Sequence, residues 1–332
     1  RTNGQAMTLG ATTLTGTATL DTTKAGTTAM GAAIAIGAVT GATNSLVLTP
    51  GTAGTVNGTS TTNVGTLTIN GSQAATFSGA VAATTVDLSS KAAGAASFNG
   101  GLTATTLTTG TNPIAINQLG GTVTSSTIYG NTGALSLNGV TFTNGATATA
   151  SSGVTLANTV AATAAGAALS LGDSVTAITL TGSPTLSTNA GTLTLGGAVN
   201  GTALTITNSG ALNLNGVVTL TGALSQTNAA TGTTTVGATV NAGSVDLKGT
   251  TLALGGNTIN VAAGAATLAH SAAVTTTTGS IVAGTLTLNG AGAVGTSGTS
   301  LPTAASALVL GKTAGDTFVS TTGGTTLAGT TG

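Results

Sequence analysis

The stretch that most constrains the fold of this chain runs from residue 191 to 222 and reads GTLTLGGAVNGTALTITNSGALNLNGVVTLTG. Its short runs of alternating apolar and small polar residues are each closed by Gly, Asn-Gly or Asn-Ser-Gly, and they predict short β-strands separated by turns. Leu193 and Leu212 open two of these runs. The interval between these two leucines would hold two or three strands and return the chain above itself, which predicts the coil of a β-solenoid.

Runs of the same kind recur at nearly the same interval. Leu46-Val47-Leu48 is followed by Leu67-Thr68-Ile69 and then by Val86-Asp87-Leu88. No linker or change of composition marks a domain boundary. We therefore predict an all-β parallel β-solenoid with roughly 19–21 residues per coil and a single domain over residues 1–332. Leu193 should stack on Leu212 in the next coil, and Leu67 on Val86.

Nine Asn-Gly pairs leave a second architecture open. Each pair alone is typical of a tight β-hairpin, so a β-sandwich of hairpins is the alternative fold. A sandwich core usually needs aromatic residues, and this chain has only four Phe and one Tyr. In a solenoid, the same Asn would adopt the left-handed conformation at a corner and stack on Asn of the next coil. The Asn residues of these pairs are Asn3, Asn57, Asn70, Asn99, Asn138, Asn144, Asn200, Asn215 and Asn289.

Composition excludes several classes of partner. Only 3% of the residues are charged and the formal net charge is zero, so no positive field would attract nucleic acid. Without cysteine there is neither a disulfide framework nor a thiolate metal site. The most apolar stretch, residues 29–39, is too short to cross a bilayer, and we expect no membrane insertion. A hydrophobic content of 40% with four prolines favours ordered structure over disorder.

The few residues that could carry chemistry are far apart in sequence. Glycosidases and lyases need clustered carboxylates, whereas the five Asp are dispersed and Glu is absent. His270 is the only histidine and has no nearby acid for a dyad or a zinc site. Isolated Asp residues cannot surround a calcium ion. The sequence therefore predicts no enzyme, no catalytic residue, no cofactor and no metal. The five acids are Asp21, Asp87, Asp173, Asp246 and Asp316.

Four of the five Asp have a lysine close by in the sequence. The pairs predict exposed ion pairs at turns, each contributing about 0–1 kcal/mol. The alternative is an isopeptide crosslink from one of these lysines, which normally requires a buried carboxylate beside it. The pairs are Asp21 with Lys24, Asp87 with Lys91, Asp246 with Lys248 and Asp316 with Lys312.

The phrases GTLTLNG, GALNLNGVVTLTG and VNAGSVDLKG resemble the β-strand-repeat passenger regions of large secreted bacterial adhesins, of the filamentous-haemagglutinin-like and autotransporter-like kinds. The resemblance implies a right-handed parallel β-helix that is exported to the cell surface, with a role in adhesion, aggregation or matrix building. The chain shows neither the secretion domain nor the membrane barrel of that family.

These observations predict a secreted structural or adhesive protein of the cell surface. Repeat patterning reaches from Thr8-Leu9 to Thr326-Leu327 without a capping element, so we expect copies to associate head to tail or laterally into a fibre or matrix filament. Other cell surfaces or matrix polymers are further expected partners. The alternative is that the chain is a segment of a giant monomeric adhesin.

A Thr-x-Thr motif with an apolar centre suggests another function. Flat ranks of outward threonine resemble the ice-binding face of some β-solenoid antifreeze proteins. The motif recurs at irregular spacing. It begins at Thr13, Thr66, Thr106, Thr141, Thr179, Thr192, Thr205, Thr219 and Thr285.

Overall fold

The chain folds into strands that pair in parallel from coil to coil. The computed structural model describes residues 1–227 and 231–328. No helix is present in these residues, and the chain divides into two compact units, Arg1–Thr155 and Leu156–Gly332. The all-β parallel β-solenoid expected from the sequence is thereby confirmed, and the hairpin sandwich is excluded because neighbouring strands run parallel. The handedness of the coil and the single domain stay predictions.

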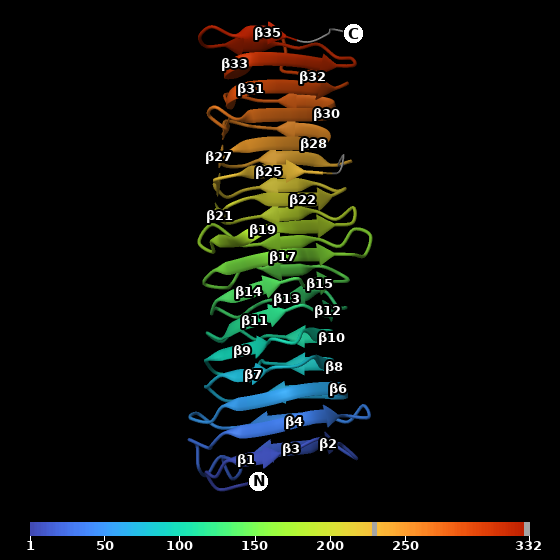
Figure 1. Ribbon diagram of the computed structural model, residues 1–332, viewed down its shortest axis with the longest axis vertical. Helices are drawn as coiled ribbons and strands as arrows, with labels where there is room; N and C mark the ends of the chain where they lie inside the picture. Colours follow the sequence, from blue (N-terminus) through green and yellow to red (C-terminus); the bar gives the residue numbers. More distant parts are fainter. Residues whose placement is uncertain (228–230, 329–332) are drawn as a thin grey trace. The chain divides into compact units, whose positions relative to one another are not determined.

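The first unit contains sixteen strands and the start of a seventeenth, β17 (Val154–Ala162). Figure 1 shows them in blue and green, stacked edge to edge. They are β1 (Met7–Leu9), β2 (Thr12–Thr13), β3 (Ala18–Asp21), β4 (Ile34–Thr40), β5 (Leu46–Thr49), β6 (Val56–Ile69), β7 (Ala75–Phe77), β8 (Val81–Asp87), β9 (Ala95–Phe98), β10 (Leu102–Thr108), β11 (Ala115–Leu119), β12 (Thr122–Val123), β13 (Thr127–Ile128), β14 (Leu135–Asn138), β15 (Thr141–Phe142) and β16 (Ala146–Ala148).

The second unit, described by itself, also consists of strands that pair in parallel. Its strands are β18 (Leu169–Leu171), β19 (Ile178–Thr188), β20 (Leu193–Leu195), β21 (Val199–Gly201), β22 (Leu204–Asn208), β23 (Leu212–Leu214), β24 (Val218–Leu220), β25 (Ala223–Gln226), β26 (Thr233–Val236), β27 (Val240–Asn241), β28 (Ser244–Ala253), β29 (Thr258–Asn260), β30 (Ala265–Thr275), β31 (Ser280–Gly290), β32 (Ala293–Val294), β33 (Leu301–Lys312), β34 (Val319–Thr321) and β35 (Thr326–Ala328).

The register confirms both stacking predictions. Leu193 pairs with Leu212 between β20 and β23, and Leu67 pairs with Val86 between β6 and β8. The coil length varies more than expected. The coil that separates Met7 from its partner Ile34 is much longer than the one that separates Leu301 from Val319. The first coil is long because a loop over residues 22–33 is inserted between β3 and β4.

Alternation along each strand separates the core from the surface. In β20, Leu193 and Leu195 are buried and Thr194 between them lies partly exposed. Because the strands pair in parallel register, the next coil places the same kind of residue at the same position, and the alternation of buried and exposed side chains is repeated. The interior of each unit is therefore a set of stacked Leu, Val and Ile columns.

Aromatic rings enter the core where the adjacent coil leaves room. Phe77 stacks on Phe98 with ring centroids 6.0 Å apart and planes 13° apart. On its other side, Phe77 pairs with Gly58, where a Cβ would lie only 2.4 Å from the ring. Gly58 is thus required by the neighbouring ring and not by a turn.

The Asn-Gly pairs behave differently from the sequence prediction. None of the nine Asn residues has a positive φ, so the expectation that these Asn adopt the left-handed conformation was wrong. The glycine does so instead at five of the pairs, because it carries no Cβ and adopts positive φ at no steric cost. Those glycines are Gly4, Gly71, Gly139, Gly145 and Gly290.

Candidate functional site

The residues that could support catalysis remain dispersed in the folded chain. Across residues 1–227 and 231–328, no three His, Cys, Asp or Glu side chains come close enough to hold a metal ion. His270 lies in β30 and is 1% exposed. Asp246 lies in the adjacent strand β28, but it pairs in register with Thr267 and not with His270. That the chain has no enzymatic activity and binds no cofactor or metal remains a prediction.

Three of the aspartates hold turns together. Asp21 Oδ1 accepts hydrogen bonds from Thr23 N at 2.8 Å and from Thr23 Oγ1 at 2.6 Å, which lowers the pKa of its carboxyl. Asp87 Oδ1 accepts the same two bonds from Ser89. Asp173 Oδ1 accepts from the backbone N–H groups of Val175 and Thr176, which lower its pKa. An Asp side chain that accepts a hydrogen bond from the backbone N–H two or three residues later stabilises a turn.

Only one of the four expected Asp–Lys ion pairs forms among the described residues. Lys248 Nζ lies 3.2 Å from Asp246 Oδ2. Asp21 is 4% exposed and pairs with Arg1 at 3.4 Å, so the expectation of an exposed Asp21–Lys24 pair was wrong. The lysines near Asp87 and Asp316 bond to backbone oxygens, Lys91 to Gln73 and Lys312 to Gly292.

Lys91 is buried at a corner of the first unit. Its Nζ donates to the backbone oxygen of Gln73, which is not the side-chain amide or carboxylate that an isopeptide crosslink requires. Its own backbone oxygen accepts from Asn112 Nδ2 at 3.0 Å. Burial lowers the pKa of the Lys91 ammonium to about 8. Lys91 thus fixes the corner instead of forming the expected surface pair with Asp87.

His270 lies between two glycines of the adjacent coils. It pairs with Gly249 in the preceding coil, and Gly290 packs against its backbone in the next one. Both ring nitrogens are buried and have no hydrogen-bond partner within the described residues. Burial lowers the pKa of the imidazole to about 4. The sequence indicated only that His270 is isolated from any acid, and the structure places its side chain in the interior.

The outer surface carries columns of small polar side chains. In the first unit, Thr66, Thr85 and Thr106 lie in register on successive coils. Ser45 extends the column below, where its Oγ accepts from Thr66 N at 3.3 Å, and Ser125 extends it above, 3.5 Å from Thr106 Oγ1. These five residues are the hydroxyl column.

Amide side chains form similar ladders. Asn117 Nδ2 donates to Ser97 Oγ at 3.1 Å across one coil step in the first unit. In the second unit, Asn260 Nδ2 donates to Asn241 Oδ1 at 3.2 Å. Asn241 and Asn260 thus form an Asn-on-Asn ladder, but neither belongs to the nine Asn-Gly pairs for which such stacking was expected.

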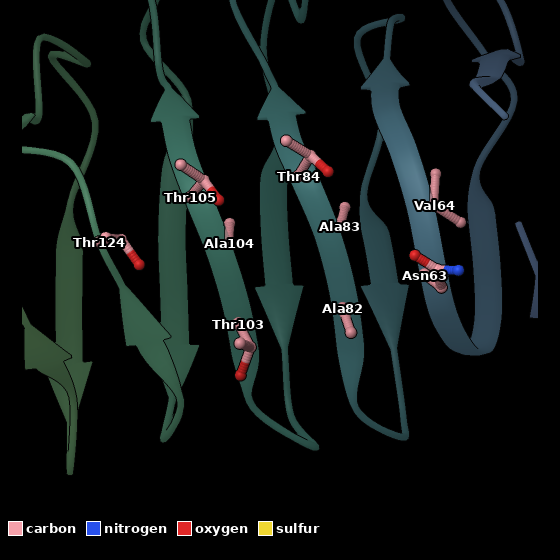
Figure 2. A pocket seen from close by; sticks show the side chains of 9 residues that line it. All are labelled: Asn63, Val64, Ala82, Ala83, Thr84, Thr103, Ala104, Thr105 and Thr124. Carbon is pink, nitrogen blue, oxygen red and sulfur yellow. The ribbon is translucent and has the colours of Figure 1, made fainter. Parts of the chain in front are cut away.

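A shallow hollow of about 260 Å³ crosses β6, β8 and β10 in the first unit (Figure 2). Ala83 pairs in register with Val64 on one side and with Ala104 on the other, and these three small residues run across the hollow. Figure 2 shows Thr84 and Thr105 at equivalent positions beside them. The lining has no charged, aromatic or titratable side chain, so the hollow has no group for acid–base chemistry. The other lining residues are Asn63, Ala82, Thr103 and Thr124.

The Thr-x-Thr motifs fall on several different columns. In the first unit, Thr66 and Thr68 are separated from Thr106 and Thr108 by a coil that presents Asp87 at the second position. In the second unit, Thr179 pairs with Asn200, and Asn200 pairs with Thr219. Thr179, Asn200 and Thr219 are exposed, and so is the threonine two positions after each of them. This surface, residues 179, 181, 200, 202, 219 and 221, is the three-coil threonine face.

Sequence reasoning missed the polar groups inside the solenoid. Tyr129 is buried, donates to Gln118 Oε1 at 2.8 Å, and has a pKa raised by burial. In the second unit, Gln226 Nε2 donates to buried Asn208 Oδ1 at 2.8 Å. A signal exists in hindsight, because Gln118 and Gln226 occupy positions where the alternation demands an apolar residue. Buried polar groups are usually hydrogen-bonded, and the Gln226–Asn208 bond joins neighbouring coils, whereas the Tyr129–Gln118 bond lies within one coil.

Comparison of the chain with protein-family models, curated protein sequences and solved structures finds no match. The resemblance to adhesin passenger regions therefore stays a prediction. Among the described residues, no helix has the length and hydrophobicity needed to cross a membrane.

Proposed function

We propose that this chain is a structural and adhesive β-solenoid of the cell surface, secreted and without catalytic activity. The observation that carries the proposal is the outer surface of each unit. Columns of Ser, Thr and Asn repeat coil after coil, while the charged side chains of the described residues form only two ion pairs, Arg1–Asp21 and Asp246–Lys248. Such a surface offers many weak hydrogen-bonding groups at a spacing of roughly 4.8 Å and little net repulsion. It suits contact with a repetitive partner over a large area.

We propose further that copies associate into filaments. Parallel strands expose backbone N–H and C=O groups along any uncovered edge, and another copy can satisfy them in a head-to-tail contact that does not close. Leu327 in β35 pairs in register with buried Leu308 yet is 68% exposed. A further coil would cover this side chain. That coil would come from a second copy in a filament, or from the same polypeptide in a giant monomeric adhesin.

Light scattering and electron microscopy of the purified chain over a dilution series test this proposal. We expect mass to grow with concentration and rods to lengthen along one axis. The double variant Thr205→Lys/Thr207→Lys places charge on an outer column and should suppress lateral bundles while leaving single rods intact. Monomers that persist at high concentration would contradict self-association. The adhesive role is tested separately, by retention of fluorescently labelled chain on bacterial cells and on neutral polysaccharide films.

The three-coil threonine face supports a second candidate function, ice binding. Its six exposed side chains form two adjacent columns over three successive coils, five Thr and one Asn. Thermal hysteresis measured on the purified chain decides between the candidates, because a surface adhesin should show none. If hysteresis is present, the variant Thr202→Lys should abolish it, since a charged side chain would interrupt the face at its centre.

A further inference from the structure

The nine Asn-Gly pairs differ in how much freedom the fold leaves them. An Asn side chain attacks its own backbone most readily when the next residue is glycine, because no side chain blocks the following N–H. The reaction also needs an Asn amide that can rotate and a glycine N–H that can lose its proton. Each pair can therefore be judged by the hydrogen bonds of these two groups.

Asn99-Gly100 meets all of these conditions. The pair lies in the turn between β9 and β10, and both residues are exposed. The Asn99 backbone N–H donates to Phe77 O at 2.9 Å, which anchors the turn, and the Gly101 N–H donates to Phe98 O at 3.3 Å. The Asn99 side-chain amide and the Gly100 N–H have no hydrogen-bond partner within the described part of the chain.

The fold restrains the other pairs. Asn70 and Asn144 donate their side-chain amides to Thr49 Oγ1 at 3.1 Å and to Thr124 O at 2.7 Å. The Gly4 and Gly216 N–H groups donate to Thr22 O at 2.8 Å and to Leu195 O at 3.2 Å. Gly58 lies within the paired strand β6, Gly201 and Gly290 are the paired last residues of β21 and β31, and Asn138 has a bonded partner.

We propose that Asn99 is the site of a spontaneous covalent modification, succinimide formation followed by hydrolysis. The Gly100 nitrogen loses its proton and attacks Asn99 Cγ, which forms a C–N bond and expels the side-chain nitrogen as ammonia. Water then opens either carbonyl of the five-membered ring. The products are aspartate, or isoaspartate in which the backbone runs through the side chain. The net reaction consumes one water and releases one ammonia, and it needs no other reactant.

The modification changes a chain that is otherwise nearly without charge. A carboxylate at residue 99 moves the formal net charge from zero to minus one. Isoaspartate also lengthens the backbone of a turn that is tightly packed, since a Cβ at Gly100 would lie 2.2 Å from the backbone carbon of Gly79. The pair of strands that this turn joins should loosen as the protein ages. The inference is independent of the proposed function.

Timed incubation of the full chain at mildly alkaline pH tests the proposal. Intact mass spectrometry follows the exchange of amide for carboxylate, and peptide mapping after non-specific proteolysis assigns the site. Asn144 is the matched internal control, because it is also an exposed Asn before glycine but its amide is tethered. We expect Asn99 to convert about tenfold faster, which corresponds to about 1.4 kcal/mol in the barrier and to the upper range of one hydrogen bond.

Two variants and one unfolded sample complete the test. Asn99→Gln should remove most of the early mass gain, and Asn144→Gln should leave it unchanged. In denaturant, all nine pairs should convert at similar rates, since the fold no longer distinguishes them. Conversion of Asn144 as fast as Asn99 in the folded chain would overturn the proposal. So would an unmodified Asn99 in folded protein under conditions where the denatured chain converts.

Discussion

The buried imidazole of His270 makes the stability of the second unit depend on pH. Both ring nitrogens lie inside the solenoid without a hydrogen-bond partner among the described residues, so burial disfavours the charged form and lowers the pKa to about 4 from an ordinary value of 6.5. In the unfolded chain the imidazole regains its ordinary pKa. Between pH 6.5 and about 4, the unfolded state therefore binds a proton that the folded state does not.

The sign and size of the effect follow from this difference. The contribution of His270 to stability is fully present above pH 6.5 and is lost as the pH falls toward about 4. A difference of this size in pKa corresponds to about 3 kcal/mol of the free energy of unfolding. His270 is the only histidine of the chain. It is thus the one side chain whose ordinary pKa lies between about pH 5 and 7.

Denaturant unfolding followed by circular dichroism, at several pH values from neutral to mildly acidic, measures the loss. The variant His270→Leu has no titratable group at this position and should lack the slope. At neutral pH it should be at least as stable as the wild type, because two unpartnered buried nitrogens are removed. His270→Gln is the second comparison, in case leucine disturbs the packing against Gly249 and Gly290. Equal slopes in the wild type and in both variants would refute the reasoning and would mean that the imidazole is solvated in solution.

Three further predictions concern the core and the turns. Leu212→Ala removes a fully buried side chain from a stacked column and should cost about 2–5 kcal/mol of unfolding free energy, measured from the denaturant midpoint, whereas exposed Thr219→Ala should cost little. Gly58→Ala should lower the free energy of unfolding by about 1–3 kcal/mol, because the new methyl group would meet the Phe77 ring. Gly16→Ala, where no atom lies within 4 Å, should leave stability unchanged, and equal thermal midpoints for the two variants would contradict the packing. Asp21→Ala leaves two backbone N–H groups and a hydroxyl without their acceptor and should lower the free energy of unfolding by about 1–3 kcal/mol. Asp316→Ala, at an exposed position, should have little effect, and chemical denaturation of both variants measures the difference.

The sequence by itself determined the architecture and the direction of most side chains. Alternation assigns Leu193 and Leu195 to one face and Thr194 to the other, and the recurrence of the same pattern one coil later places Leu212 on Leu193. These inferences succeed because alternation is a property of the extended backbone alone. The same alternation, read more strictly, would have flagged Gln118 and Gln226 as buried amides.

Only the tertiary structure decided what each turn and each charged residue does. Asp21 lies near Lys24 in sequence but pairs with Arg1, and Lys91 reaches the backbone of Gln73. Such contacts join different coils, so they depend on the length of every intervening turn and on which residue takes a positive φ. The spacing of residues along the sequence gives neither the lengths of these turns nor the residues with positive φ. His270 shows the same limit, because its neighbours Gly249 and Gly290 come from the coils before and after it.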